Sequence, residues 1–315
     1  MGVSPPADTS APARIFGILA RAAPVAVLFR RGPSRHVQML RWDLETDKVT
    51  PGQWLKHRVY ERRGDLSPDG RHLIYFAAPH KPPLDSYTAI SRPPYFTALA
   101  LLPHGGAWNG GGVFLDNKRY WVDQSGPCIP QADQHHPGCT LSRVMQPPAH
   151  LVPSMGEDAV LYLPRLQRDG WTLEAQDTTG SGWLRTETWH LSRPVIAGWT
   201  LHKRFTASLT EKGPQGQIYW ETHRLEGPDG GQDLHDGWAE AHRGEVLFAK
   251  DGDLFRQAPR GTPRLIAHLT PNRFEPVSAP YEGIIRPTSP ATSPPTSSGP
   301  IKDMSPWHPL KDDKT

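Results

Sequence analysis

The sequence has little of what several protein classes depend on. Two cysteines in 315 residues cannot build a disulfide scaffold. No stretch approaches the roughly 20 apolar residues that a helix needs to cross a bilayer. The formal charge of +3, from 35 basic and 32 acidic residues, is too balanced to indicate nucleic acid or an acidic membrane as the partner. We therefore expect a cytoplasmic protein that binds neither nucleic acid nor membrane.

The sequence also contains no recognisable targeting segment. The best candidate, residues 15–29, is interrupted by Arg21 and Pro24. It has no basic region before it and no small-residue cleavage site after it, so we expect no signal peptide.

Turn-forming and aromatic residues are abundant. The 29 glycines and 35 prolines favour many turns and few long helices, and 11 tryptophans suit the half-buried surface of a sheet. Along most of the chain, apolar and polar residues alternate with a period of 2. In residues 195–205, for example, apolar residues alternate with Thr200, His202 and Arg204, as in a half-buried strand. Only Ala13–Ala22 has apolar residues at helical spacing, and Pro24 follows it. The sequence predicts an all-β fold with a short N-terminal helix at most.

One turn gives the architecture more detail. In "RRGDLSPDGRHLIYFAA", residues 62–78, Pro68 presets φ for a tight turn and Asp69-Gly70 accepts the positive φ that such a turn requires. The strand that follows is apolar at nearly every position, which indicates burial on both faces. This short segment resembles the repeat of TolB-type and WD40-like β-propellers, in which Ser-Pro-Asp-Gly links the first two strands of a blade.

Looser versions of this plan recur along the chain. Turns are expected at four further places: Gly32-Pro33, Asp116-Asn117, Asp169-Gly170 and Asp251-Gly252. The apolar centres lie near residues 28, 74, 114, 161 and 247, with a tryptophan-rich block at 183–222. Spacings of roughly 40 to 47 residues match a four-stranded blade. We predict a single β-propeller of about five or six irregular four-stranded blades over residues 13–286, with a pair of β-sandwiches as the main rival. Residues 1–12 and the Pro/Ser/Thr-rich tail 287–315 have the composition of unstructured ends.

One loop combines residues that bind metals. "CIPQADQHHPGC", residues 128–139, contains Cys128, His135, His136 and Cys139. Zinc accepts such mixed sulfur and nitrogen ligands tetrahedrally, so these four residues are the candidate ligands of a structural zinc ion. The spacing fits no common zinc motif, and a loop disulfide or an ordinary polar connection are the alternatives.

Three other patterns have simpler interpretations than a functional site. The glycine run 104–114 lacks the Lys-Ser/Thr ending of a phosphate-binding loop, and we expect a turn or bulge there. Residues 234–242 carry two histidines and two acids, but not at the His-Glu-x-x-His spacing. Four tryptophans could form a platform for stacking sugars, although packing between sheets is the simpler expectation; they are Trp183, Trp189, Trp199 and Trp220.

No catalytic set is recognisable. We therefore expect a non-enzymatic binding or scaffold protein whose partner is another protein. The alternatives are a hydrolase or lyase with its site in the central channel of the propeller, and a domain that serves assembly in a larger complex.

Overall fold

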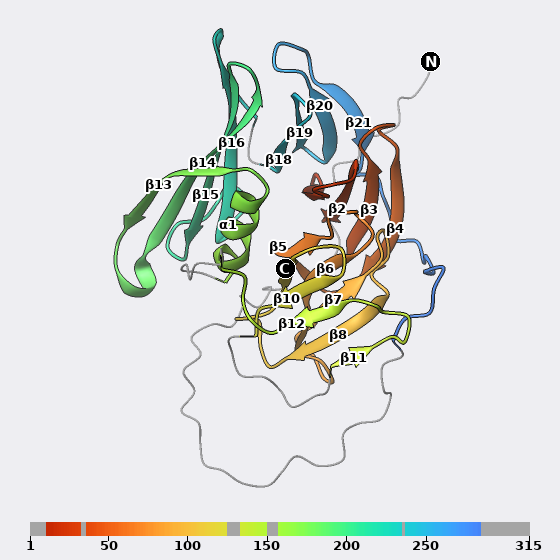
Figure 1. The fold of residues 1–315 in the computed structure, drawn as a ribbon. Helices are drawn as coiled ribbons and strands as arrows, with labels where there is room; N and C mark the ends of the chain where they lie inside the picture. The colour runs from red at the N-terminus through yellow and green to blue at the C-terminus, as the bar shows by residue number, and fades with distance from the viewer. Residues whose placement is uncertain (1–10, 33–35, 125–132, 150–156, 235–236, 285–315) are drawn as a thin grey trace, which may run out of the picture. The chain divides into compact units, whose positions relative to one another are not determined.

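The computed structural model describes residues 11–32, 36–124, 133–149, 157–234 and 237–284 of the chain (Figure 1). These residues fall within one unit, residues 1–284. The ends that the sequence predicts to be unstructured, 1–12 and 287–315, lie outside the described residues except for residues 11 and 12. The α-helix that the structure describes has ten residues and is too short to cross a membrane.

The described chain is all-β, and its strands form five sheets. Sheet I contains β1 (Arg14–Leu19), β2 (Val25–Arg31), β3 (Val37–Asp43) and β4 (Val49–Leu55). Sheet II contains β5 (Arg58–Leu66), β6 (Leu73–Ala78), β7 (Ser86–Ser91), β8 (Ala98–His104) and β11 (Gln134–His135). Sheet III contains β9 (Gly112–Phe114), β10 (Arg119–Val122) and β12 (Ser142–Val144).

The helix and the last two sheets follow. Helix α1 spans Ala159–Arg168, and a short 3-10 turn spans Gly182–Leu184. Sheet IV contains β13 (Thr172–Thr179), β14 (Thr186–Ile196), β15 (Trp199–Ser208), β16 (Tyr219–Gly227) and β17 (Gly230–Asp233). Sheet V contains β18 (Ala239–His242), β19 (Glu245–Lys250), β20 (Asp253–Gln257) and β21 (Arg264–His268).

The five sheets follow one another around α1, which is the plan of a propeller. The first strands of sheets I, II and III contact each other in order, β1 with β5 and β5 with β9. Sheet IV contacts sheet V through β14 and β18, and sheet V returns to sheet I through β19 and β1. Between sheets III and IV stands α1, which contacts β9 and packs its Tyr162 ring 5.1 Å from Phe205 of sheet IV (Figure 1). The all-β propeller class is thus confirmed. We predicted about five or six four-stranded blades, and the described residues form five sheets of three to five strands, with α1 between two of them.

Two predicted elements are wrong. Ala13–Ala22, expected to be helical, forms β1, because Ile15, Phe16 and Ile18 are all buried between neighbouring sheets and tertiary packing overrides local spacing. The strand expected near residue 161 is α1, whose residues 161–166 are buried, so its apolar run resembles that of a buried strand.

Most of the predicted turns are present. Gly70 has φ +71° and its N–H donates to the Ser67 carbonyl, so the Ser-Pro-Asp-Gly turn joins β5 to β6. Every residue of β6 is buried, as the sequence predicts. Asp251 and Gly252, with φ +52° and +83°, join β19 to β20. Gly170 also has positive φ, but it ends α1 instead of joining two strands.

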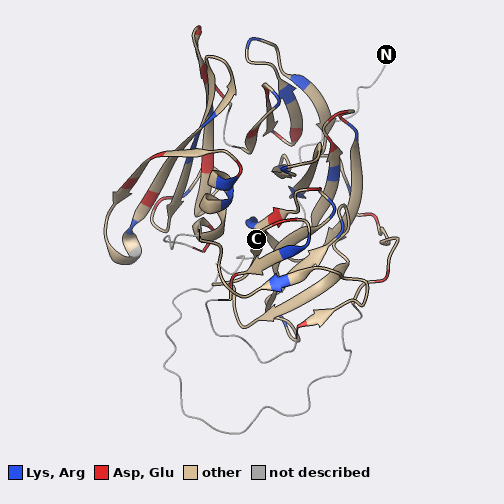
Figure 2. Cartoon of the chain, viewed as in Figure 1, with Lys and Arg blue, Asp and Glu red and all other residues tan. Residues whose placement is uncertain are grey.

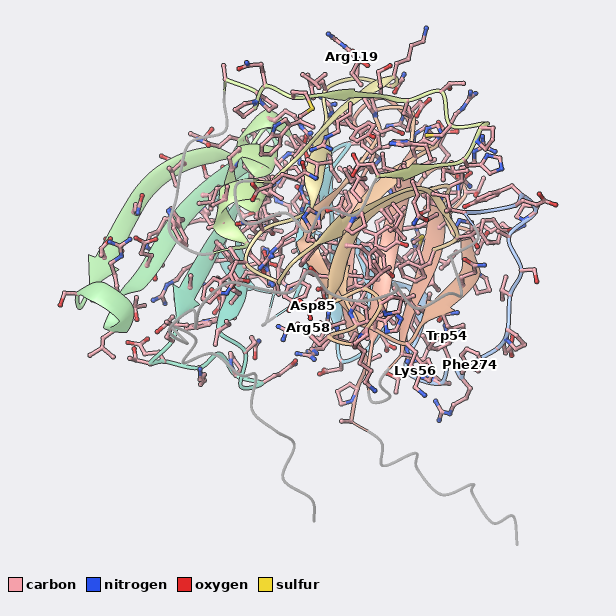
Figure 3. All side chains as sticks on the ribbon, turned by 90° about the horizontal axis from the view of Figure 1, so that it is seen from below. Trp54, Lys56, Arg58, Asp85, Arg119 and Phe274 are labelled. Atoms are coloured by element: carbon pink, nitrogen blue, oxygen red, sulfur yellow. The ribbon has the colours of Figure 1, made fainter. Side chains whose placement is uncertain are left out.

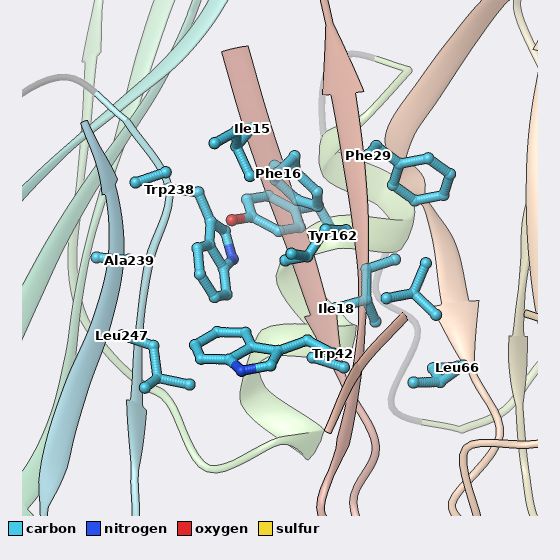
Figure 4. Close-up of a cluster of buried hydrophobic side chains, with 14 of the residues drawn as sticks. Ile15, Phe16, Ile18, Phe29, Trp42, Leu66, Tyr162, Trp238, Ala239 and Leu247 are labelled. Atoms are coloured by element: carbon cyan, nitrogen blue, oxygen red, sulfur yellow. The ribbon is translucent and has the colours of Figure 1, made fainter. Parts of the chain in front are cut away.

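The main hydrophobic core fills the space between the first strands and the helix. It joins residues of sheets I, II, IV and V to α1 (Figure 4). Gly17 lies where a Cβ atom would be 2.5 Å from the Trp238 ring, so only glycine lets β1 approach sheet V this closely.

The first and last sheets of the propeller, sheets I and V, are joined without strand pairing between them. Among the described residues, no strand of sheet V pairs with a strand of sheet I. Instead, Arg30 of β2 donates to the carbonyls of Leu269 and Thr270, at 3.1 and 2.7 Å. The segment 269–284 then continues past sheet I to sheet II, where the Ile284 N–H donates to the Ala98 carbonyl.

Candidate functional site

The centre of the ring contains many charged residues, and they hold α1 in place. Arg63 of β5 binds Asp158 and Glu157 at the start of the helix, at 2.8 Å for Asp158. At the other end, Arg168 forms a bidentate pair with Asp65 of β5, at 2.7 and 2.8 Å. The side chains of Arg63 and Asp65 are 1% and 0% exposed, so these pairs connect elements rather than face solvent.

A second buried network joins α1 to sheet IV. The Lys203 Nζ donates to the Tyr162 hydroxyl and to Glu221, both at 2.9 Å, and the Tyr162 hydroxyl donates to Glu221 at 2.7 Å. Burial lowers the pKa of Lys203, but the Glu221 carboxylate raises it by more, so the lysine stays charged. Burial raises the pKa of Glu221, while Lys203 and Arg62 bring it below the usual range.

His223 lies beside this network and stays neutral. Its side chain is 0% exposed, and Nε2 is 3.7 Å from a Glu221 oxygen, too far for a hydrogen bond. Burial and the nearby Lys203 lower its pKa to about 3. The charged groups described at the centre are therefore mostly buried and paired with one another.

Sheet IV presents a different surface on its other side. Along β16 the residues alternate strictly: Glu221, His223 and Leu225 are buried, whereas Arg224 and Glu226 are exposed. On β15 the same alternation runs from Trp199 to Phe205, after which Thr206 and Ser208 are buried. One face of the sheet thus packs against α1, and the opposite face, which we call the outward face, carries the polar side chains of the alternation. Figure 2 marks the charged positions along the strands of this sheet.

A groove of about 930 Å³ lies on the outward face of sheet IV. Its lining comes from all five strands of the sheet: Glu174, His190, Leu191, Ser192, Thr200, His202, Lys203, Arg204, Thr222, His223, Arg224 and Asp233. Leu191, Lys203 and His223 are buried and alternate onto the inward face. The side chains that face the groove are therefore hydroxyls, imidazoles, guanidiniums and carboxylates.

The acidic groups of the groove each have a partner. Asp233 accepts from Arg224 at 2.9 Å, and Glu174 accepts from the Ser192 hydroxyl at 2.5 Å. Outside the lining, Asp177 and Glu226 lie 2.8 and 3.4 Å from the Nε2 atoms of His190 and His202.

Arg204 differs from these groups. It is exposed on β15, the middle strand of the sheet, directly between His190 and Thr222 in the strand register. It forms no ion pair or hydrogen bond with the residues that the structure describes. The groove thus has a guanidinium without a counter-ion at its centre, and it is flanked by donors of hydrogen bonds.

Beyond the groove, the same side of the sheet carries two pairs of hydroxyl residues, and all four residues are buried. Thr188 and Thr206 are 3.2 Å apart through their hydroxyls, and Thr186 and Ser208 are 2.7 Å apart. Trp220 lies on the same face, in register with Thr206. Trp189 and Trp199 are buried and pack in the core, so the four tryptophans that we considered as a sugar platform do not form one surface. The side chain of Trp183 lies outside what the structure describes.

The predicted zinc ligands lie elsewhere, in and after sheet II. Cys128 lies outside the described residues. His135 is exposed in β11, His136 accepts from the Gly138 N–H through Nδ1 at 2.9 Å, and Cys139 is partly buried. Among the described residues, no group of three or more metal-binding side chains converges. The zinc hypothesis stays a prediction.

The glycine run 104–114 and the segment 234–242 have structural roles in the part of the chain that the structure describes. Gly110 and Gly111 have positive φ and lead into β9, so the glycine run is a turn, as predicted. Glu240, from the segment 234–242, accepts from the Trp171 indole and from Arg193, at 2.8 and 2.5 Å.

Comparison with known proteins does not identify a family. No protein-family model matches the chain, and no curated protein matches it significantly. One solved structure is similar, "The beta-propeller domain of the Trilobed protease from Pyrococcus furiosus reveals an open velcro topology". It is 8% identical, with a TM-score of 0.30, and the match covers 83% of this chain and 100% of that one. A TM-score this low supports no conclusion, and the propeller assignment rests on the sheets described above.

Proposed function

We propose that this protein is a non-enzymatic binding domain and that the outward face of sheet IV holds its partner, another protein. The observation that carries the proposal is the groove with Arg204 at its centre. Arg224 and Asp233 of the groove form an ion pair, and Glu174 accepts a hydrogen bond from Ser192. Arg204, in contrast, is exposed and lacks a counter-ion among the described residues.

The chemistry of the groove favours a partner segment with an acidic side chain. A guanidinium forms two parallel hydrogen bonds with a carboxylate, and the hydroxyls beside Arg204 can orient the rest of the segment. The alternative of a hydrolase or lyase site in the central channel has less support, because the charged groups described there are buried and paired.

The test is partner capture with charge-reversed baits. Purified protein with Arg204→Glu is compared with wild type and with Arg41→Glu as bait for proteins from the native organism. Arg41 is the matched control: it lies on β3, an inner strand of sheet I, and forms no ion pair with the described residues. We expect a protein that wild type and the Arg41 variant retain and that the Arg204 variant loses. Equal capture by all three baits would contradict the proposal, and so would turnover of ester or glycoside substrates by the purified protein.

A further inference from the structure

A cluster of arginine residues, separate from the groove of sheet IV, lies where β1 and β5 begin. The register of β1 and β2 places Arg14 directly opposite Arg31. Like charges opposite each other in an antiparallel pair destabilise the sheet, so this arrangement is unfavourable by itself. The Arg31 Nη2 donates to the carbonyl of Val59, the residue after Arg58 in β5, and the charges of Arg31 and Arg58 both lie close enough to act on Arg14.

Few carboxylates balance the positive charges of Arg14, Arg31 and Arg58. Glu61 is bound to Arg31 at 3.1 Å. Glu157 lies close enough to interact with Arg58, but its carboxylate is bound to Arg63. Neither Arg14 nor Arg58 forms an ion pair with any residue in the described ranges.

The cluster is also held in shape. The Arg58 guanidinium lies over the Tyr60 ring, 4.5 Å from its centre, and Arg63 lies 4.7 Å from the same ring. Stacking of this kind fixes the plane of a guanidinium before a ligand arrives. Burial lowers the pKa of Arg14, and the neighbouring charge of Arg31 lowers it further, as expected for opposed guanidiniums. Arg58 lies at the surface of the molecule (Figure 3).

We propose that Arg14, Arg31 and Arg58 form a binding site for a phosphoryl group. A tetrahedral oxyanion with two negative charges matches several guanidinium donors supplied by three strands, β1, β2 and β5, and it removes the repulsion between Arg14 and Arg31. The site goes beyond the proposed function, because it uses sheets I and II and none of the groove residues.

The experiment measures phosphate binding by calorimetry and by thermal unfolding, at pH 7.5 and at constant ionic strength. Inorganic phosphate, O-phosphoserine and acetate are the probes. Wild type is compared with Arg14→Gln, Arg58→Gln and the control Arg41→Gln. Inorganic phosphate reports a site for the free ion, and tighter binding of O-phosphoserine reports a site for a phosphorylated molecule. Acetate tests whether a single carboxylate suffices.

We expect saturable binding of phosphate or phosphoserine to wild type and to the Arg41 variant. The loss of a charge-assisted hydrogen bond should raise Kd by about tenfold or more in the Arg14 and Arg58 variants. Without phosphate, the Arg14 variant should melt at or above the wild-type temperature, because it no longer opposes Arg31. Absence of saturable binding by either phosphorylated probe, binding unchanged in the Arg14 variant, or acetate binding as tight as phosphate would overturn the proposal. Partner capture by the Arg14 variant should stay at the wild-type level, so the two proposals fail separately.

Discussion

Replacing Lys203 by methionine tests the network that holds α1 against sheet IV. Methionine keeps much of the apolar stem that packs near Trp171, whose ring centre is 4.8 Å from the ammonium group. The substitution removes the charge that lies 2.9 Å from Glu221. The variant therefore isolates the ionic part of the contact.

The expected loss follows from what remains around Glu221. Removing one partner of a buried ion pair costs about 3 to 5 kcal/mol. Arg62 still lies 3.0 Å from the other carboxylate oxygen, so we expect a value near the lower limit, about 3 kcal/mol. With an unfolding entropy of roughly 2.1 cal/mol/K per residue over residues 1–284, this loss lowers Tm by about 5 °C.

Urea unfolding followed by tryptophan fluorescence and circular dichroism measures the change. Lys56→Met, at an exposed lysine, is the control and should stay within about 0.5 kcal/mol of wild type (Figure 3). The double variant Lys203→Met, Glu221→Gln should lose less than the sum of the two single variants, because they remove the two members of one pair. A Lys203→Met protein as stable as the Lys56 control would refute the reasoning.

Three further predictions concern acid stability, ring closure and zinc. With a folded pKa of about 3 for His223 and roughly 6.5 for an unfolded histidine, the unfolded state binds the proton first as the pH falls. His223 should thus cost about 2 kcal/mol of stability between pH 7.5 and 5, and unfolding of His223→Gln at the two pH values should show a smaller loss than wild type; equal losses would contradict the assignment. Arg30→Gln removes two charge-assisted hydrogen bonds that join the ends of the ring and should cost about 1.5 to 3 kcal/mol in the same assay, whereas a change under about 0.5 kcal/mol would mean that other contacts close it. For zinc, elemental analysis of untagged protein should show an equimolar ion that a Cys128→Ser, Cys139→Ser variant lacks; substoichiometric metal in both would leave an ordinary loop.

The sequence predicts the parts of this fold that local chemistry determines. Asp-Gly pairs need no distant contact to form their turns, and both the blade turn before β6 and the β19–β20 turn are where we expected them. The alternation of Thr200, His202 and Arg204 also indicates which side of β15 faces outward.

The errors and omissions come from non-local packing. A buried strand and a largely buried helix both present an apolar run, so the sequence predicts a strand where α1 forms. The groove needs five strands side by side, and the arginine cluster needs the pairing of Arg14 with Arg31. Neither arrangement can be inferred from spacing along the chain.

Site-specific photo-crosslinking tests the binding face most directly. A photo-reactive amino acid replaces Thr222, which faces the groove beside Arg204, or Thr50, on β4 of sheet I, and each protein is irradiated in extract of the native organism. The account predicts a crosslinked protein from position 222 that is absent from position 50 and that disappears when Arg204→Glu is added. A crosslink from position 50 alone, or one from position 222 that persists in the Arg204→Glu background, would contradict it.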